Sequence, residues 1–264
     1  MTAHTLVLRL AAPLQSWGST SQFNRRDTDS EPTKSAIVGL LAAAEGRRRG
    51  DPIEDLLLLR FAVRVDQSGS LLRDYHTVSD FRGGDLRSSD VNAKGQQKRN
   101  RGKATAVTQR FYVQDAVFIA LIEGTQDVLE GLASAVLAPG FPLALGRRAC
   151  VPTQPILLGC GDGPVWSGEL TDVALQLPWQ AAAWNKRIHA REAADPTTVR
   201  LSFTVDDPNG GDVRHDVPTT FAPKERSFTS RAVTRRWLDV STGLEPRADG
   251  ERLVSHDPLA LLGW

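Results

Sequence analysis

The chain reads Val117-Phe-Ile-Ala-Leu-Ile122 near its middle, and this run of six apolar residues predicts a strongly apolar strand. The apolar residues of the next segment recur at helical spacing and predict a helix over Gln126–Leu137, with one side buried. This strand and helix form one half of the predicted fold. A second strand and helix precede them in the sequence.

The upstream half begins at Thr5-Leu-Val-Leu-Arg-Leu10, which predicts a short buried strand that ends before Pro13. Pro32-Thr-Lys-Ser35 opens a predicted helix with Thr33 as its N-cap. Its apolar residues again fall on one face: Ile37, Leu40, Leu41 and Ala44.

Further strands are predicted at Phe61–Asp66 and at Leu71–Val78, paired with each other through a Ser-Gly turn. Ile156–Leu158 is expected to close the sheet. The order strand, helix, strand, strand, helix, strand predicts an α+β fold with a ferredoxin-like, RRM-type core over residues 1–160.

Residues 161–264 are predicted to form a second, smaller and β-rich part. A helix is expected around Trp179–Glu192, with strands at Val199–Val205 and Arg231–Val240. A turn is expected at Asp207-Pro-Asn-Gly-Gly211.

Composition narrows the classes of function. The 264 residues hold 32 Lys and Arg against 31 Asp and Glu, so nucleic-acid binding requires an uneven placement of charge. Two cysteines, Cys150 and Cys160, cannot supply a thiolate zinc site, and no two histidines stand at metal-ligand spacing, so we expect no metal and no cofactor. The longest apolar stretch, Ala36–Ala44, is about half of a membrane span, and we expect a cytoplasmic protein.

Residues 79–110 stand out as a polar, basic insertion in the predicted core. The segment contains eight basic residues and three carboxylates, and Phe81 is its only aromatic residue. A charge run of this kind is either a solvated loop or an arm that binds a phosphate backbone, and the excess within a nearly neutral chain favours binding. The basic residues are Arg82, Arg87, Lys94, Lys98, Arg99, Arg101, Lys103 and Arg110.

Two other places suit an anion. Lys34 and Ser35 lie in the first turn of a predicted helix, where free amides and the dipole attract negative charge, unless Thr33 simply caps the helix and Lys34 is solvated. Arg147 and Arg148 follow Gly146 directly, so that the arginines could reach a phosphate from a glycine turn.

An enzymatic alternative rests on Tyr75 and His76. With Lys98 or Lys103 they could cleave RNA without a metal, the base taking the 2′-hydroxyl proton and the lysine stabilising the charged transition state. Tyr75 and His76 point to opposite faces of a strand, however, and such residues more often pack or stack than catalyse.

Four sequence blocks occur in a fixed order, and together they resemble the CasD family, the subunits that bind the 5′ handle of crRNA in the type I-E CRISPR complex Cascade. A weaker match follows at Arg226–Arg231, and nothing familiar appears in residues 243–264. The blocks are Leu8-Arg-Leu-Ala-Ala-Pro-Leu-Gln-Ser-Trp-Gly18, Pro32-Thr-Lys-Ser-Ala-Ile-Val-Gly-Leu-Leu41, Leu72-Arg-Asp-Tyr-His-Thr-Val78 and Leu145-Gly-Arg-Arg-Ala-Cys-Val-Pro152.

The resemblance implies a ferredoxin-like RAMP core, with residues 79–110 as a β-hairpin thumb, and a non-catalytic subunit that caps the filament of backbone subunits. It also implies contact with the large subunit, and with target DNA only through the complex. In a related type I-C member the subunit itself processes repeat RNA, which keeps the endoribonuclease alternative open.

The resemblance also places RNA contacts along the chain. Gln15, Ser16 and Trp17 match the first loop, Lys34 matches a basic helix start, and Arg147 with Arg148 match the glycine-loop arginines. Splayed bases stack on flat side chains, for which the candidates are Trp17, Tyr75 and His76. For Trp17 a place in the core is an equal alternative.

Overall fold

The computed structural model describes residues 3–18, 24–79, 105–161, 163–222 and 225–246. Strands and helices follow one another along the chain with these bounds: β1 (His4–Gln15), β2 (Arg25–Arg26), α1 (Lys34–Ala44), α2 (Glu54–Leu57), β3 (Arg60–Gln67), β4 (Ser70–Ser79), β5 (Thr105–Gly124), α3 (Gln126–Leu137), β6 (Val165–Ser167), α4 (Leu170–Gln176), α5 (Ala183–Glu192), β7 (Thr198–Asp206), β8 (Asp212–Thr220) and β9 (Ser227–Ser241).

The strands form one sheet dominated by antiparallel pairs, in the order β6-β1-β5-β3-β7-β9-β8, with β2 and β4 pairing β5 outside this path. Strand β5 organises the sheet because its two halves have different partners. Its second half pairs with β1 and β3, whereas its first half, up to Gln114, pairs with β4.

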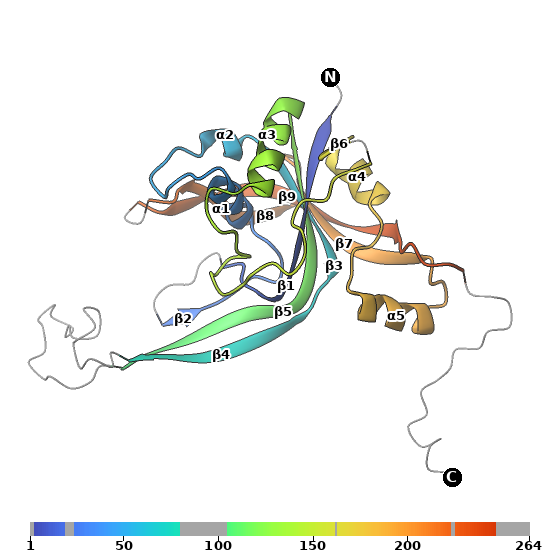
Figure 1. Cartoon of the computed structure of the whole chain (residues 1–264), viewed down its shortest axis with the longest axis horizontal. Helices are drawn as coiled ribbons and strands as arrows, with labels where there is room; N and C mark the ends of the chain where they lie inside the picture. Colours follow the sequence, from blue (N-terminus) through green and yellow to red (C-terminus); the bar gives the residue numbers. More distant parts are fainter. Residues whose placement is uncertain (1–2, 19–23, 80–104, 162, 223–224, 247–264) are drawn as a thin grey trace, which may run out of the picture.

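Helices cover both faces of the sheet, and Figure 1 shows α1 and α3 on one side and α4 on the other. The strand β5 supplies both cores by alternation: Phe118 and Ile122 pack beneath α1 and α3, and Ile119 and Leu121 pack beneath α4. This two-sided burial explains why residues 117–122 are apolar without interruption.

Two strand predictions need correction. Strand β1 does not end before Pro13 but continues to Gln15. Its register with β5 passes from Ala12 to Leu14, and the skipped Pro13 falls opposite Asp115, which has a φ of 54°. A proline without an N–H is tolerated there because it faces an irregularity in the ladder.

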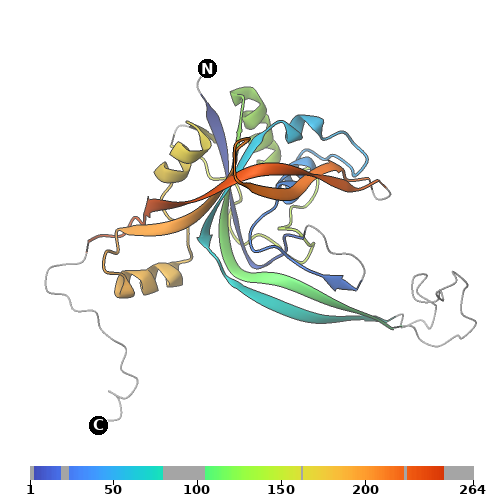
Figure 2. The same ribbon diagram turned by 180° about the vertical axis from the view of Figure 1, so that it is seen from behind.

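The second correction concerns the partner of β4. This strand follows β3 through a tight turn, as predicted, but it pairs with β5 over ten residues and not with β3. The other edge of β3 is taken by β7. The paired segments Ser70–Ser79 and Thr105–Gln114 project from the body of the protein, as Figures 1 and 2 both show. We call this pair the ribbon.

The predicted insertion, residues 79–110, overlaps the ribbon at its ends. Arg110 lies in β5, whereas the other seven basic residues of the insertion lie outside the described residues, between positions 80 and 104. The ribbon therefore ends where that basic segment begins.

The part after residue 160 continues the same sheet on both edges. Strand β6 pairs with the start of β1, next to an isolated bridge between Leu8 and Leu157, so the predicted strand Ile156–Leu158 contributes a single bridge. On the far edge β7, β9 and β8 follow β3, and Figure 2 shows them crossing the molecule. The division into two parts at residue 160 stays a prediction.

Predicted helix bounds agree with the structure to within a few residues, but β5 begins at Thr105, well before the predicted Val117, and β2, α2, β6 and α4 have no predicted counterpart. Helix α5 begins at Ala183, not at Trp179, because Trp179 is buried and its indole N–H donates to the carbonyl of Asp66 at 2.7 Å. Strand β8 has no counterpart among the predicted strands. Among the residues that the structure describes, no helix has the length and apolar character needed to cross a membrane.

Candidate nucleic-acid interface

Arginines from separate parts of the chain lie near the middle of the ribbon. Strand β2 consists of Arg25 and Arg26, which align with Gln109 and Arg110 of β5. On the other edge of β5, Asp74 of β4 is the cross-strand partner of Arg110. The chain thus places β2, β5 and β4 side by side, with basic side chains on all three strands.

Arg147 joins a fourth segment to this place. Its guanidinium donates to the carbonyls of Phe111 and Arg26, both at 2.8 Å, and lies over the ring of Tyr112 at 4.5 Å. Arg25 lies over the ring of Phe111 at 5.0 Å. Arg147 therefore holds the glycine loop, β2 and β5 together, while the neighbouring Arg148 is exposed.

Gly146 explains how the loop comes so close. It has a φ of +96°, and a Cβ at this position would stand 1.8 Å from the carbonyl oxygen of Ser16. No other residue fits, because both the backbone conformation and the close approach demand glycine. Two of the blocks that carry the resemblance, around Gln15 and around Arg147, are thereby packed against each other.

The predicted first-loop residues lie inside this packed region. The side-chain amide of Gln15 is buried and donates to the carbonyls of Leu10 and Ala116. Trp17 is 1% exposed and packs edge-on against Phe118. Ser16 is buried, and its N–H donates to Leu145. These three residues are therefore packed in the interior, and for Trp17 the core alternative describes its position.

Tyr75 and His76 lie on the ribbon, and they point to opposite faces because they are neighbours on a strand. Tyr75 is 67% exposed, and it is aligned with Gln109 and, through it, with Arg25. His76 is partly exposed, and its Nδ1 lies 3.8 Å from Asp74. Tyr75 thus lies on the same face of the ribbon as Arg73 and on the face opposite to Arg110, and its exposed ring is available for stacking.

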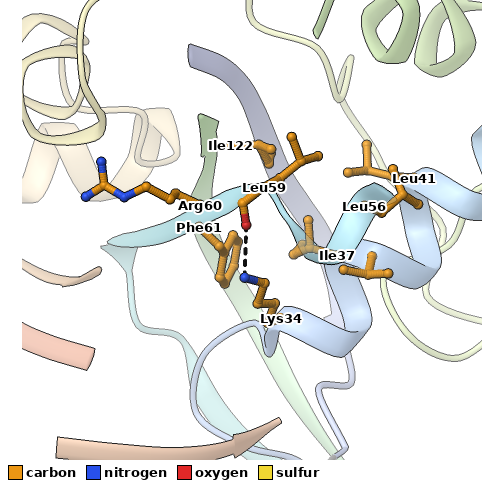
Figure 3. Close-up of a pocket in the computed structure, with 9 residues that line it drawn as sticks. Lys34, Ile37, Leu41, Leu56, Leu59, Arg60, Phe61 and Ile122 are labelled. Carbon is orange, nitrogen blue, oxygen red and sulfur yellow. Dashed lines mark hydrogen bonds between the residues drawn. The ribbon is translucent and has the colours of Figure 1, made fainter. Parts of the chain in front are cut away.

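Lys34 lies elsewhere, in a buried ionic network at the start of α1. Its ammonium donates to the carbonyl of Leu59 and to Asp206, both at 2.9 Å, and Figure 3 shows the first of these bonds at the edge of a small apolar pocket. Its backbone N–H donates to Asp216 at 2.9 Å. The anion site predicted at this helix end is occupied by the protein's own carboxylate.

The hydroxyl groups at the start of α1 also have hydrogen-bond partners within the protein. Thr33 caps α1 by accepting from the N–H of Ala36, and its hydroxyl lies 3.2 Å from that of Ser35. Both hydroxyl side chains are buried. Lys34 and Ser35 are therefore committed to the fold, which is a correction to their predicted exposure to a phosphate.

Arg231 completes the network and explains the weak match at residues 226–231. Its guanidinium makes an ion pair with Asp206 and a two-pronged one with Asp216, at 2.7 and 2.9 Å. Burial alone raises the pKa of Asp216, but the hydrogen bonds and charge of Arg231 outweigh it, so the pKa lies below its usual value.

The structure adds three arginines to the site: Arg25, Arg26 and Arg73. From the sequence, Arg25 and Arg26 belong to a polar loop, and their adjacency is the only signal that points to them. Arg73 is exposed on β4, where it aligns with Phe111. Its position becomes meaningful only through the pairing of β4 with β5.

No arrangement for metal or thiol chemistry appears among the described residues. No group of three His, Cys, Asp or Glu side chains in that part of the chain could hold a metal ion. Cys150 is buried, and burial raises its thiol pKa, which makes it inert. Of the alternative catalytic set, Lys98 and Lys103 lie outside the described residues.

Comparisons with known proteins agree with this picture. The family model described as "CRISPR-associated protein (Cas_Cas5)" matches residues 5–234. Over 168 residues the chain is 37% identical to the "CRISPR system Cascade subunit CasD" of Escherichia coli strain K12, covering 58% of this chain and 70% of that protein.

Two solved structures are similar along nearly the whole chain. A chain of a "CRISPR RNA-guided surveillance complex" matches with a TM-score of 0.69 and 32% identity, covering 93% of this chain and 95% of that one. A "Crystal structure of Cas protein" matches with a TM-score of 0.62 and 30% identity, covering 92% and 98%. The resemblance inferred from the four sequence blocks is confirmed.

Proposed function

Because the chain belongs to the Cas5 family of CRISPR-associated proteins, we propose that it is a non-catalytic subunit of a Cascade complex, which binds the 5′ handle of crRNA. In this role it caps the filament of backbone subunits, contacts the large subunit and meets target DNA only through the complex. The relative named as a Cascade subunit and the similar chain of an RNA-guided complex support the assignment.

The observation that carries the proposal is the concentration of arginines near the middle of the ribbon. Residues 24–27, 73–76, 107–112 and 147–148 lie on adjoining segments and hold six arginines against two carboxylates, Asp27 and Asp74, with Arg73 and Arg110 on opposite faces of the ribbon. The whole chain has a formal charge of only +1, so this concentration is local. Such a surface suits a phosphate backbone, because each phosphate neutralised releases condensed counterions.

The finer architecture is part of the same proposal. The order β6-β1-β5-β3, with α1 and α3 as the connecting helices, supports a ferredoxin-like RAMP core. The ribbon supports residues 79–110 as a thumb whose basic side chains lie along the RNA. Residues from 161 onward are proposed as the smaller carboxy-terminal part, which also lends β6 to the sheet of the core.

A charge-removing pair of variants tests RNA binding at this surface. Replacing Arg25 and Arg26 by alanine should weaken the binding of a synthetic handle RNA, and it should lower the slope of log affinity against log salt by about one for each phosphate that is no longer neutralised. Arg48 and Arg49 are a matched control, since they are also adjacent and exposed but lie in the loop between α1 and α2. Equal salt slopes in both variants would contradict the proposed surface.

The endoribonuclease alternative predicts that the protein cleaves RNA without a metal ion. Incubation with repeat RNA and a chelator would give a single cut at the handle boundary, lost in a His76→Ala variant. The opposite orientation of Tyr75 and His76 does not favour a shared catalytic site. We therefore expect the RNA to stay intact.

A further inference from the structure

A hollow of about 310 Å³ lies at the foot of the ribbon, between the turn that joins β3 to β4 and the first turn of α5. It is separate from the buried network around Lys34. Its walls come from three places: the turn, the segment of β5 around Asp115 and the start of α5. The lining residues are Gln67, Ser68, Gly69, Ser70, Gln114, Asp115, Trp184 and Asn185.

The walls of the hollow are fixed by hydrogen bonds. The side chain of Gln67 donates to the carbonyl of Asp115 and accepts from Asn185 and from the N–H of Ala182, both at 3.1 Å. Gln114 donates to the hydroxyl of Ser70 at 2.8 Å. One buried glutamine therefore ties the start of α5 to Asp115 of β5, so the hollow is built in advance of any ligand.

The backbone around the hollow is held in conformations that are uncommon for ordinary residues. Asp115 has a φ of 54° without being a glycine. Gly69 has a φ of +66°, and a Cβ there would stand 2.3 Å from the carbonyl oxygen of Gln114. Such conformations persist where the surrounding structure imposes them, and they gather at ligand sites.

Trp184 gives the hollow a flat aromatic wall. Its side chain remains 42% exposed at the rim, on a helix that has no fully buried residue. A large ring left partly in water is available for stacking, since every nucleobase offers a matching π-face.

The polar groups of the hollow indicate the chemistry of its ligand. Hydroxyl and amide groups can donate to and accept from the edge of a base, and a carboxylate such as Asp115 accepts from an exocyclic amine. None of the eight lining residues is a cation, and Asp115 would repel a phosphate. A planar, uncharged ligand with hydrogen-bonding edges fits better than an anion or a purely apolar side chain.

We propose that this hollow receives one unpaired base of the crRNA, stacked on Trp184, while the arginines of the ribbon hold the neighbouring phosphates. The inference rests on the proposed function, because it needs RNA at the ribbon. Ser70 and Gln114 are cross-strand partners at the foot of the ribbon, so a strand of RNA that follows the ribbon arrives beside the hollow.

An abasic scan tests this inference. A synthetic RNA that carries the handle of the host's CRISPR repeat and the first spacer nucleotides is made with one base removed at a time. Trp184→Ala should weaken binding of the intact RNA by about 5- to 100-fold, the range expected for one stacked base. For one abasic position the variant should bind as well as the natural protein, since the stacked base is already gone.

Three comparisons separate the outcomes. Trp184→Phe keeps a flat ring and should restore most of the affinity. Trp237→Ala removes another exposed tryptophan, one on β9, and should leave binding unchanged. The salt slope should also stay the same in Trp184→Ala, because stacking neutralises no phosphate.

Other results would overturn the inference. If the natural chain binds the RNA but Trp184→Ala binds it equally well, no base occupies the hollow and the proposed function still stands. Normal RNA binding with loss of Trp184→Ala from the assembled complex would assign the hollow to a protein neighbour instead. If the natural chain does not bind the RNA at all, the proposed function fails together with the inference.

Discussion

At the scale of the residue, Lys34 and Arg231 show how charged side chains in recognisable sequence blocks can serve the fold itself. Both lie in one buried network with Asp206 and Asp216, which joins the start of α1 to β7, β8 and β9. Removing one member leaves an uncompensated buried charge, so each is indispensable without touching a ligand.

Asp216 gives this network a measurable pH dependence. Its pKa in the folded protein is lowered, so its stabilising contribution is complete above the ordinary aspartate pKa of about 3.9 and disappears as the pH falls through the lower folded value. Asp216→Asn should lower the free energy of unfolding at pH 7 by about 3 kcal/mol. Below about pH 4 the natural protein should lose more stability than the variant.

Urea unfolding between pH 7 and pH 3 checks this expectation. Asp212→Asn is the control, because Asp212 is exposed at the start of the same strand, and it should behave like the natural protein. A parallel loss of stability with pH in the natural protein and in Asp216→Asn would contradict the role given to this carboxyl.

The sequence alone does not distinguish residues that stabilise the fold from residues that are exposed and free to contact RNA. Gln15, Trp17 and Lys34 are predicted RNA contacts because they stand in recognisable blocks, yet all three side chains are buried. A recognisable sequence block indicates that a residue type is needed at a position. Whether that side chain is buried depends on which other parts of the chain pack over it. Arg147 supports the fold by donating to two carbonyl groups, and its neighbour Arg148 is exposed.

At the scale of the element, local patterns predict the helices and the apolar strands, and they fail where pairing is non-local. The periodicity of Gln126–Leu137 predicts α3 with its bounds. The choice of β5 over β3 as the partner of β4 is different, because it depends on the unusual backbone at Asp115 and on β7 taking the free edge of β3. Neither is visible within β4 itself.

The basic segment beyond the ribbon carries its own prediction. Reversing the charges at Lys98, Arg99 and Arg101 should weaken retention of crRNA, so that the RNA is released at a lower salt concentration, because attraction is removed and repulsion is added. Filter binding over a range of salt concentrations measures this. A variant that assembles and responds to salt like the natural protein would refute the thumb assignment.

At the scale of the whole molecule, one sheet joins the sequence blocks at two places. The block around Gln15 meets the block around Arg147 beside the ribbon, and the block around Lys34 meets Arg231 on the far strands. The match of the family model to residues 5–234 covers both places. Sequence segments that are distant along the chain therefore pack against each other, and each of the two places is built from two such segments.

Sequencing of the RNA bound to a tagged copy purified from its native host is the most direct test of the central claim. The account predicts CRISPR RNAs with a uniform 5′ handle, recovered together with several partner proteins. The same purification of the Arg25→Ala, Arg26→Ala variant should retain less of this RNA. Recovery of no RNA, or of a mixture of cellular transcripts, would contradict the assignment of this protein to crRNA binding.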